Sequence, residues 1–306
     1  MQYFFAPMEG LTDSVYRRLH HKYFGGVDSY YMPFLSPTVH RSLTPREARE
    51  LPPAHSEGFC AVPQLLTKNA EDFLWMAQQC KALGYEEVNL NLGCPSGTVT
   101  AKGKGRGMLR DPDGLDAFLY NIFAGAPLPI SVKTRIGFES PEEFPRLLEI
   151  FNRYPISLLI IHPRVRSQFY KGDVTMDSFR YAAENSRAPL CYNGDITDPS
   201  QAEALGKEFP IANSTMIGRG LIADPGMLCG GTTAEKLEGF MGQLLEEYTE
   251  VFGSSRNAMF RLKENWGMLE SRFDGGEKLF KQLRKTTDYS QFRSLTQQIL
   301  HNIPLK

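Results

Sequence analysis

The stretch AVPQLLTKNAEDFLWMAQQCKALGYEEVNLNL, residues 61–92, contains a complete strand–helix–strand pattern. Two short apolar runs, Ala61–Leu66 and Glu87–Leu92, flank a segment with helical periodicity, Asn69–Leu83. The apolar residues of that segment fall on one helical face: Phe73, Met76, Ala77, Cys80 and Leu83. An asparagine is suited to cap the start of such a helix, and Gly84 is suited to end it. We therefore expect a helix between two buried strands.

Similar apolar runs, each bounded by Gly, Pro or polar residues, recur along the chain as far as Gly218. The eight runs are Tyr3–Ala6, Ser29–Met32, Ala61–Leu66, Glu87–Leu92, Pro129–Thr134, Ser157–His162, Pro189–Tyr192 and Ser214–Gly218. Alternating strands and helices predict parallel strands with right-handed crossovers, and eight such units close more naturally into a TIM (β/α)8 barrel than into an open sheet. A doubly wound sheet is the alternative. Its G-x-G-x-x-G turn is absent after the first run, where A-P-M-E-G stands.

After Ala234 the pattern changes to helices only. The expected helices are Glu235–Phe252, Arg256–Phe273, Glu277–Lys285 and Ser290–Leu300. The first is acidic and the later ones carry many basic residues, so charge is segregated along this part of the chain. We predict a barrel domain over residues 1–234 and a small helical domain over residues 235–306.

Composition places the chain among ordinary globular proteins. It has 306 residues, 42% of them hydrophobic, and a formal net charge of −1, so the molecule as a whole carries no basic signal for nucleic acid. The five cysteines are odd in number and form no C-x-x-C, which argues against a disulfide framework and against a zinc site. No apolar stretch is long enough to span a membrane, and the N-terminus lacks the features of an export signal. We expect a cytoplasmic protein without a metal, and a monomer.

Barrel enzymes carry their reactive groups at the carboxyl ends of the strands, so the candidates are polar residues within, at the end of or just after the runs. They are Met8, Glu9, Gln64, Asn91, Cys94, Lys133, His162, Arg164, Asn193-Gly194-Asp195 and Gly218-Arg219-Gly220. The last two groups follow the seventh and eighth runs, where Gly-rich turns and a short helix N-terminus favour an anion. A phosphorylated cofactor would fit there.

Cys94 differs from the other four cysteines, which stand in runs that predict core positions. Its surroundings, N-L-G-C-P-S-G-T-V-T-A-K-G-K-G-R-G-M-L, predict a loop in which the thiol is reachable from solvent. The basic residues of Lys102–Arg110 are spaced by glycines in the same loop. A cysteine in a loop indicates function more than packing.

Six motifs occur in a recognisable order between Ala6 and about Asp224: A-P-M-E-G-L-T-D, L-N-L-G-C-P-S-G-T-V, S-V-K-T-R-I-G, I-H-P-R-V-R-S-Q-F-Y, N-G-D-I and M-I-G-R-G. Together they resemble the dihydrouridine synthase family, and the later R-L-K-E-N-W-G-M-L-E is similar to the family's helical RNA-binding domain. The chain departs from the family pattern H-G-R-T, because Pro163 and Val165 stand at two of its positions.

The resemblance implies an FMN-dependent enzyme that reduces uridine to dihydrouridine in tRNA, with NADPH as the electron donor. It implies that FMN is bound by Pro7, Met8, Glu9, Gln64, Lys133, His162, Asn193, Gly194, Asp195, Gly218 and Arg219. It places the catalytic cysteine at Cys94 and the substrate contacts at Asn91, Arg164 and Tyr170.

The chemistry agrees with these residue types. The uracil C5=C6 bond is conjugated to the C4 carbonyl, so it accepts hydride at C6 and then needs a proton at C5. A thiol with a reference pKa of about 8.5 is mostly protonated at neutral pH and can act as that acid. The loop Lys102–Arg110 and the basic C-terminal helices are expected to contact RNA phosphates. Alternatives are a flavoenzyme acting on a free pyrimidine, a synthase acting on ribosomal RNA and an RNA-binding scaffold without flavin.

Overall fold

The computed structural model describes the chain except for residues 39, 55–57, 95, 102 and 166–171. Its strands all run parallel, in the order β3-β2-β1-β9-β8-β7-β6-β5-β4. Their bounds are β1 Gln2–Phe5, β2 Ser29–Tyr31, β3 Ala61–Val62, β4 Gln64–Leu65, β5 Val88–Leu92, β6 Ile130–Arg135, β7 Leu159–His162, β8 Leu190–Tyr192 and β9 Ser214–Ile217. Each lies within or overlaps one of the eight predicted apolar runs.

The two ends of this strand order are joined through Pro63. Residues of β3 pair with β2, and residues of β4 pair with β5, so the short segment Ala61–Leu65 touches both neighbours. Proline has no backbone N–H and interrupts the ladder at this point, which divides one strand of the barrel into two. The nine described strands therefore form an eight-sided ring of the TIM type, as the sequence predicts.

The inside of this ring has an apolar side and a polar side. A cluster of buried side chains comes mainly from β1, β2, β3, β7, β8 and β9: Phe4, Ala6, Tyr31, Val62, Ile160, Cys191 and Met216. Polar residues alternate along the remaining strands, with Asn89 and Asn91 on β5 and Ser131 and Lys133 on β6. Since side chains alternate between the faces of a strand, Val88, Leu90 and Leu92 point outward, and all three are buried.

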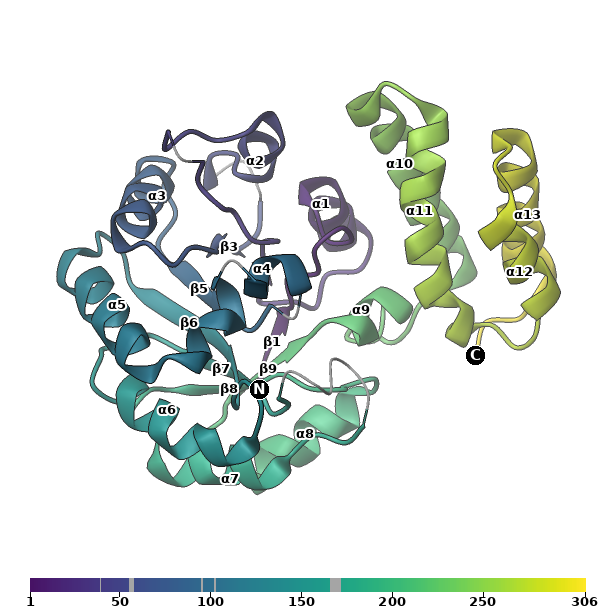
Figure 1. Ribbon diagram of the computed structural model, residues 1–306. Helices are drawn as coiled ribbons and strands as arrows, with labels where there is room; N and C mark the ends of the chain where they lie inside the picture. The colour runs from purple at the N-terminus through teal and green to yellow at the C-terminus, as the bar shows by residue number, and fades with distance from the viewer. Residues whose placement is uncertain (39, 55–57, 95, 102, 166–171) are drawn as a thin grey trace. The chain divides into compact units, whose positions relative to one another are not determined.

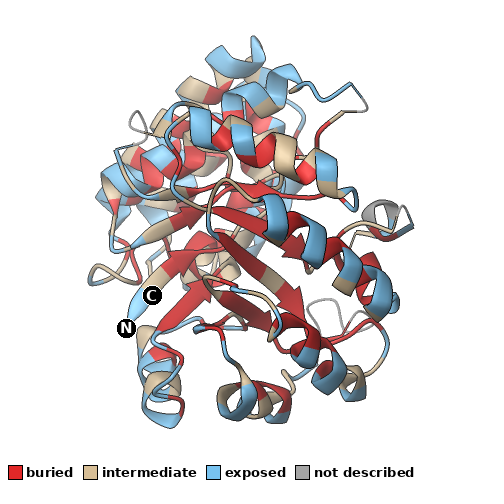
Figure 2. Cartoon of the chain, turned by 90° about the vertical axis from the view of Figure 1, so that its left-hand side faces the viewer, coloured by how far each residue is buried: buried red, intermediate tan, exposed pale blue. Residues whose placement is uncertain are grey.

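Helices surround the strands, as Figure 1 shows for α3, α5, α6, α7 and α8. The helices of this part are α2 Pro45–Glu50, α3 Ala70–Ala82, α4 Gly97–Ala101, α5 Pro112–Gly125, α6 Phe144–Phe151, α7 Met176–Asn185 and α8 Pro199–Glu208. The Asn69 side chain caps α3 by accepting the Asp72 N–H at 2.9 Å. Figure 2 shows the strands as the buried layer and the helices with exposed outer faces.

The remaining helices belong to a second compact unit, which contains residues 8–27, 195–199 and 218–306. Its helices are α1 Ser14–Tyr23, α9 Arg219–Ala223, α10 Ala234–Phe252, α11 Ser255–Leu269, α12 Glu277–Lys285 and α13 Tyr289–Asn302. The predicted helices of the C-terminal part agree with α10 to α13 within a few residues. Helix α1 packs against α10, where the Phe240 ring contacts the edges of Tyr16 and Phe24.

Two expectations about exposed residues are wrong. The segment after Cys94 is not an open basic loop, because it contains α4 and the 3-10 helix Gly105–Arg110, and Arg106 is fully buried beside Phe138. Arg106 therefore cannot contact a phosphate at the surface, and Lys102 lies outside the described residues. Among the other cysteines Cys80 and Cys191 are buried as expected, whereas Cys60 is exposed and Cys229 is half-buried. Within the described part of the chain, no helix combines the length and apolar character needed to cross a membrane.

Candidate active site

The candidate residues of the barrel unit gather at the carboxyl ends of β4 to β7. Register places Gln64 beside Asn89 and Asn91 beside Lys133 on adjacent strands, and His162 ends β7. This is the end of the barrel where enzymes of this fold carry their reactive groups. The structure therefore brings these four candidates together at one end of one sheet, and their roles stay predictions.

The Asn91 side chain holds the loop that carries Cys94. Its Oδ1 accepts the backbone N–H groups of Gly93 at 3.0 Å and Cys94 at 2.9 Å. Its Nδ2 donates to Gln64 Oε1 at 2.7 Å, and Gln64 Nε2 donates to Asn89 Oδ1 at 2.7 Å. An amide nitrogen has two hydrogens, and among the described residues Asn91 Nδ2 and Gln64 Nε2 each donate one bond, so a second hydrogen of each can serve a ligand. These residues are thus both supports of the loop and candidate binding groups.

Lys133 lies beside the same loop. Burial and the neighbouring Arg135 lower the pKa of Lys133 to about 8, while the thiols of Cys191 and Cys94 favour its charged form. No carboxylate among the described residues pairs with this ammonium. A half-buried cation with that environment is suited to an anionic or electron-rich ligand.

Arg135 is a residue of this site that sequence reasoning missed. It is 1% exposed, and its Nε donates to the Gly93 carbonyl at 3.2 Å while its Nη1 donates to the Val165 carbonyl at 3.0 Å. It therefore ties the Cys94 loop to the loop after β7. The signal available in the sequence was its position two residues after Lys133, which gives both side chains the same orientation on β6.

His162 and Arg164 form one hydrogen-bonded unit after β7. Arg164 Nη1 lies 3.2 Å from His162 Nε2, and Arg164 Nη2 donates to the Gly172 carbonyl at 2.5 Å. Because a guanidinium can only donate, a hydrogen bond at this contact requires Nε2 to be the acceptor, which corresponds to the tautomer with its proton on Nδ1. The Pro163 carbonyl accepts the Thr175 N–H at 2.8 Å, which ties this position to the residue that precedes α7. Tyr170 lies outside the described residues.

Asn193 and Gly194 follow β8 in the same unit. Asn193 Nδ2 donates to the Met216 carbonyl at 2.8 Å, which fixes the start of this turn against β9. A Cβ atom at Gly194 would lie 2.8 Å from the Tyr192 hydroxyl oxygen, so only glycine fits there without a shift. Pro7, two residues after the end of β1, is half-buried.

The other candidates belong to the second unit. Met8 N donates to Thr12 Oγ1 at 2.9 Å, and Glu9 is exposed. Asp195 has a positive φ of 43° and accepts from Arg219 Nη2 at 2.5 Å, in an ion pair that is about 40% exposed at both partners. Gly218 directly precedes α9.

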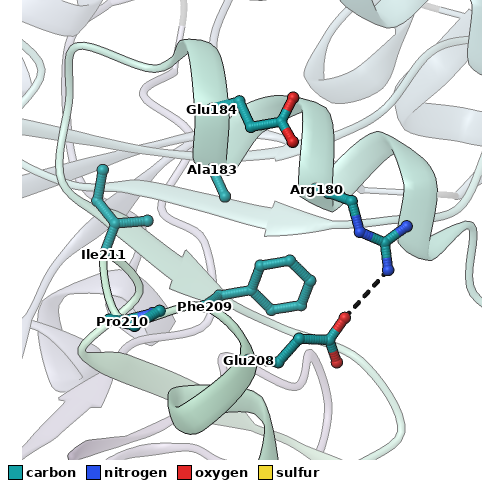
Figure 3. A pocket seen from close by; sticks show the side chains of 7 residues that line it. All are labelled: Arg180, Ala183, Glu184, Glu208, Phe209, Pro210 and Ile211. Carbon is teal, nitrogen blue, oxygen red and sulfur yellow. Dashed lines mark hydrogen bonds and ion pairs between the residues drawn. The ribbon is translucent and has the colours of Figure 1, made fainter.

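A surface pocket elsewhere on the barrel does not coincide with these residues. Its volume is about 390 Å³, and Figure 3 shows its lining side chains: Arg180, Ala183, Glu184, Glu208, Phe209, Pro210 and Ile211. They come from α7, α8 and the segment that leads into β9. The last of these enters a strand at its amino end, so the pocket lies toward the end of the barrel opposite Cys94.

Comparison with known proteins identifies the family. The model of the dihydrouridine synthase (Dus) family matches residues 4–302, so the chain belongs to the dihydrouridine synthase family.

Individual relatives agree with this assignment. The chain is 29% identical to tRNA-dihydrouridine synthase B of Pasteurella multocida, over 72% of this chain and 66% of that protein. It is 31% identical to tRNA-dihydrouridine synthase B of Proteus vulgaris, over 70% of this chain and 65% of that protein. The match thus spans slightly less than two thirds of the length of these relatives.

Solved structures support the barrel. A morphinone reductase structure matches with a TM-score of 0.51 and 12% identity, over 74% of this chain and 84% of that one. The old yellow enzyme homologue from Zymomonas mobilis matches with a TM-score of 0.52 and 11% identity, over 73% of this chain and 86% of that one. At such low identity the likeness concerns the fold alone.

Proposed function

We propose that this chain reduces uridine to 5,6-dihydrouridine in RNA and that the RNA is tRNA. The observation that carries the proposal is the Cys94 loop, held by Asn91 and Arg135 at the carboxyl end of the barrel beside Lys133. Family membership and the names of the relatives support the substrate class.

The polar residues of this end fit a flavin. Lys133 presents a cation, His162 presents an imidazole, and the second amide hydrogen of Gln64 Nε2 has no acceptor among the described residues. We assign to FMN the predicted set of Pro7, Met8, Glu9, Gln64, Lys133, His162, Asn193, Gly194, Asp195, Gly218 and Arg219, with Arg219 toward the phosphate. FMN supplies a hydride to uracil C6 when it is bound, and NADPH is the proposed electron donor.

In this proposal Cys94 provides the proton for C5 of the uracil. The hydrogen bonds from the Gly93 and Cys94 N–H groups to Asn91 fix the backbone on which the thiol is carried. General-acid catalysis requires such a fixed position, because the proton must lie within hydrogen-bond reach of the accepting carbon. The second amide hydrogen of Asn91, together with Arg164 and Tyr170, is assigned to the uridine.

The test is the Cys94→Ala variant. We expect FMN content and reduction by NADPH to stay near wild type, since a half-buried loop thiol contributes little to the core. Flavin reoxidation by tRNA in a single turnover should slow by about 10²- to 10⁴-fold, the usual effect of losing a general acid. The matched control is Cys60→Ala, which removes an exposed thiol next to β3. Equal reoxidation rates in Cys94→Ala and wild type would exclude Cys94 as the acid.

A reductase of free pyrimidines would use the same chemistry without RNA. Comparing turnover of free uridine with turnover of unmodified tRNA separates the two functions. We expect turnover only with RNA, because α12 presents three exposed lysines, Lys278, Lys281 and Lys285, that a free base would not need. Turnover of ribosomal RNA instead of tRNA would change the substrate but not the chemistry.

A further inference from the structure

The hydrogen bonds behind Asn91 continue through the barrel interior as a single chain. Asn91 donates to Gln64, Gln64 donates to Asn89, and Asn89 Nδ2 donates to Ser131 Oγ at 2.8 Å. The Ser131 hydroxyl then donates to the carboxylate of Glu87. The chain thus runs from the Cys94 loop to Glu87, the residue that directly precedes β5.

One extended segment, which includes β5, supplies residues at both ends of this hydrogen-bonded chain. Glu87, Asn89 and Asn91 alternate along one extended segment, so their side chains share the inner face of the barrel. Tyr31 lies on β2, which is not a neighbour of β5 or β6 in the ring. Burial and then the Glu87 carboxylate raise the pKa of the Tyr31 phenol, whereas Ser131 lowers it, so these side chains are close to one another. Contacts between such strands are possible only across the inside.

The groups at the two ends of the hydrogen-bonded chain determine which atom donates and which atom accepts in every bond between them. The backbone N–H groups of Gly93 and Cys94 can only donate, and an ionised carboxylate at Glu87 can only accept. Each amide between these ends must therefore turn its oxygen toward the Cys94 loop and its nitrogen toward Glu87. An amide turned the other way would place two donors or two acceptors against each other.

Solvent cannot easily replace a lost member of this chain. Asn89 and Ser131 are fully buried, and Gln64 is 1% exposed. A buried polar group that loses its partner keeps its full desolvation cost, so a defect at one end favours rearrangement along the chain. Burial raises the pKa of Glu87, whereas the hydrogen bonds from Ser131 and Tyr31 stabilise its ionised form.

We propose that Glu87, acting through Ser131, Asn89 and Gln64, is a positioning residue for the Cys94 loop, because it sets the direction in which the Asn91 amide faces the Gly93 and Cys94 N–H groups. This inference rests on the proposed function only for its consequence in catalysis. The chain of hydrogen bonds makes no use of flavin or RNA, so it can be tested without either.

The experiment measures how fast iodoacetamide alkylates Cys94 between pH 6 and 9, in a background where Cys60 and Cys229 are replaced by serine. Glu87→Gln is isosteric but replaces a group that can only accept by an amide that can either accept from Ser131 or donate to it, so the direction of the bonds is no longer fixed, and Ser131→Ala removes the link while nearly keeping its volume. Both should release the Asn91 clamp and speed alkylation of the half-buried thiol about fivefold, the effect of losing one typical hydrogen bond. The control is Glu86→Gln, the exposed neighbour, which should alkylate at the wild-type rate.

Asn89 supplies a second pair of variants. Asn89→Asp keeps the oxygen that accepts from Gln64, so the part of the chain next to Asn91 should be preserved and alkylation should stay near wild type. Asn89→Leu removes that acceptor and should behave like Glu87→Gln. This contrast separates orientation of the amides from loss of the side chain, since both replacements keep the branching and the number of side-chain heavy atoms of asparagine.

Near-UV circular dichroism and the thermal midpoint identify which variants are folded, and the rate is compared among those. Wild-type alkylation rates in the folded Glu87→Gln, Ser131→Ala or Asn89→Leu protein would overturn the proposal, as would loss of the native fold in Ser131→Ala, because a general packing role would then explain the residues. If Cys94→Ala left tRNA reduction unchanged, the proposed function would fail while the alkylation result would still decide the positioning role.

Discussion

Some residues in the barrel interior pack against one another, and others provide the polar groups of the candidate site. The apolar cluster around Phe4, Ile160 and Met216 fills one side with close-packed side chains. The opposite side holds Asn89 and Ser131, whose polar groups are buried and need defined partners, together with the half-buried Lys133. The polarity of the site therefore depends on the residues at alternate positions of only two or three strands.

Lys133 gives a prediction about pH. Burial lowers its pKa to about 8, so the ammonium is present below that pH and is lost as the pH rises above it. If its charge contributes to FMN binding, the affinity of wild type should weaken by up to about tenfold between pH 7 and pH 9. The Kd for FMN can be followed by quenching of flavin fluorescence.

Two substitutions at this position serve as controls. Lys133→Arg keeps the charge throughout this range, since the guanidinium does not titrate there, and should flatten the dependence on pH. Lys133→Met should bind FMN weakly at every pH. The same pH slope in wild type and Lys133→Arg would contradict a role for the lysine charge.

At the scale of elements, helix starts show how local sequence and distant partners combine. Asp13 caps α1 by accepting the Tyr16 N–H at 3.1 Å, as its position before the helix leads one to expect. The same carboxylate accepts from the Tyr248 hydroxyl at 2.8 Å and from Arg261 at 2.7 Å. One residue thus joins α1 to α10 and α11 inside the second unit.

We predict that Asp13→Ala lowers the free energy of unfolding by roughly 2–4 kcal/mol, since it removes a cap and leaves the mostly buried Arg261 without its partner. The matched control is Asp111→Ala, which removes the exposed cap of α5 and should cost about 1 kcal/mol. Urea unfolding followed by circular dichroism measures both. Equal losses would mean that the contacts of Asp13 with α10 and α11 contribute nothing beyond capping.

The elements were predictable to the extent that their signals are local. The helix after Asn69 starts at the predicted cap, and Gly84 adopts the positive φ of 87° that favours glycine after a helix. The buried Arg106 and the Arg135 clamp were not predictable, because an arginine in a loop or at a strand end is usually solvated. Their burial depends on Phe138 and Val165, which only the folded chain brings to them.

The hydrogen-bonded chain that ends at Glu87 illustrates the same limit. The alternation of Glu87, Asn89 and Asn91 is visible in the sequence, but the pairing of Asn89 with Ser131 depends on the register between β5 and β6. Tyr170 and part of the loop after β7 lie outside the described residues, so the predicted contact of that tyrosine with uridine stays a prediction.

For the whole molecule, the compact units bear on how RNA binding should be tested. Helix α1 precedes β2 in the chain, yet it packs with α10 in the second unit. Truncation after Ala234 would remove Phe240 from the rings of Tyr16 and Phe24 and expose them. Loss of activity in such a fragment would not distinguish lost RNA contacts from lost stability, so surface substitutions are the better test.

Helix α12 offers a suitable surface. Phe280 and Leu283 bury one face, while Lys278, Lys281 and Lys285 are exposed at spacings of three and four residues, which places them along one side of the helix. Replacing the three lysines by glutamine should leave folding and FMN content unchanged and weaken tRNA binding. If each lysine contacts a phosphate, the slope of log K for tRNA binding against log salt concentration should become less steep by roughly 2–3, close to one unit for each lost contact.

The control carries the same loss of charge on the barrel unit, near the amino ends of its strands. Lys81, Arg187 and Lys207 are exposed and lie at or just after the carboxyl ends of α3, α7 and α8, where each helix leads back to the amino end of a strand. Their triple glutamine variant should keep the wild-type salt slope, because these residues lie far from the carboxyl ends that carry Cys94. Equal weakening in both variants would show that tRNA responds only to net charge, and α12 would then have no specific part in binding.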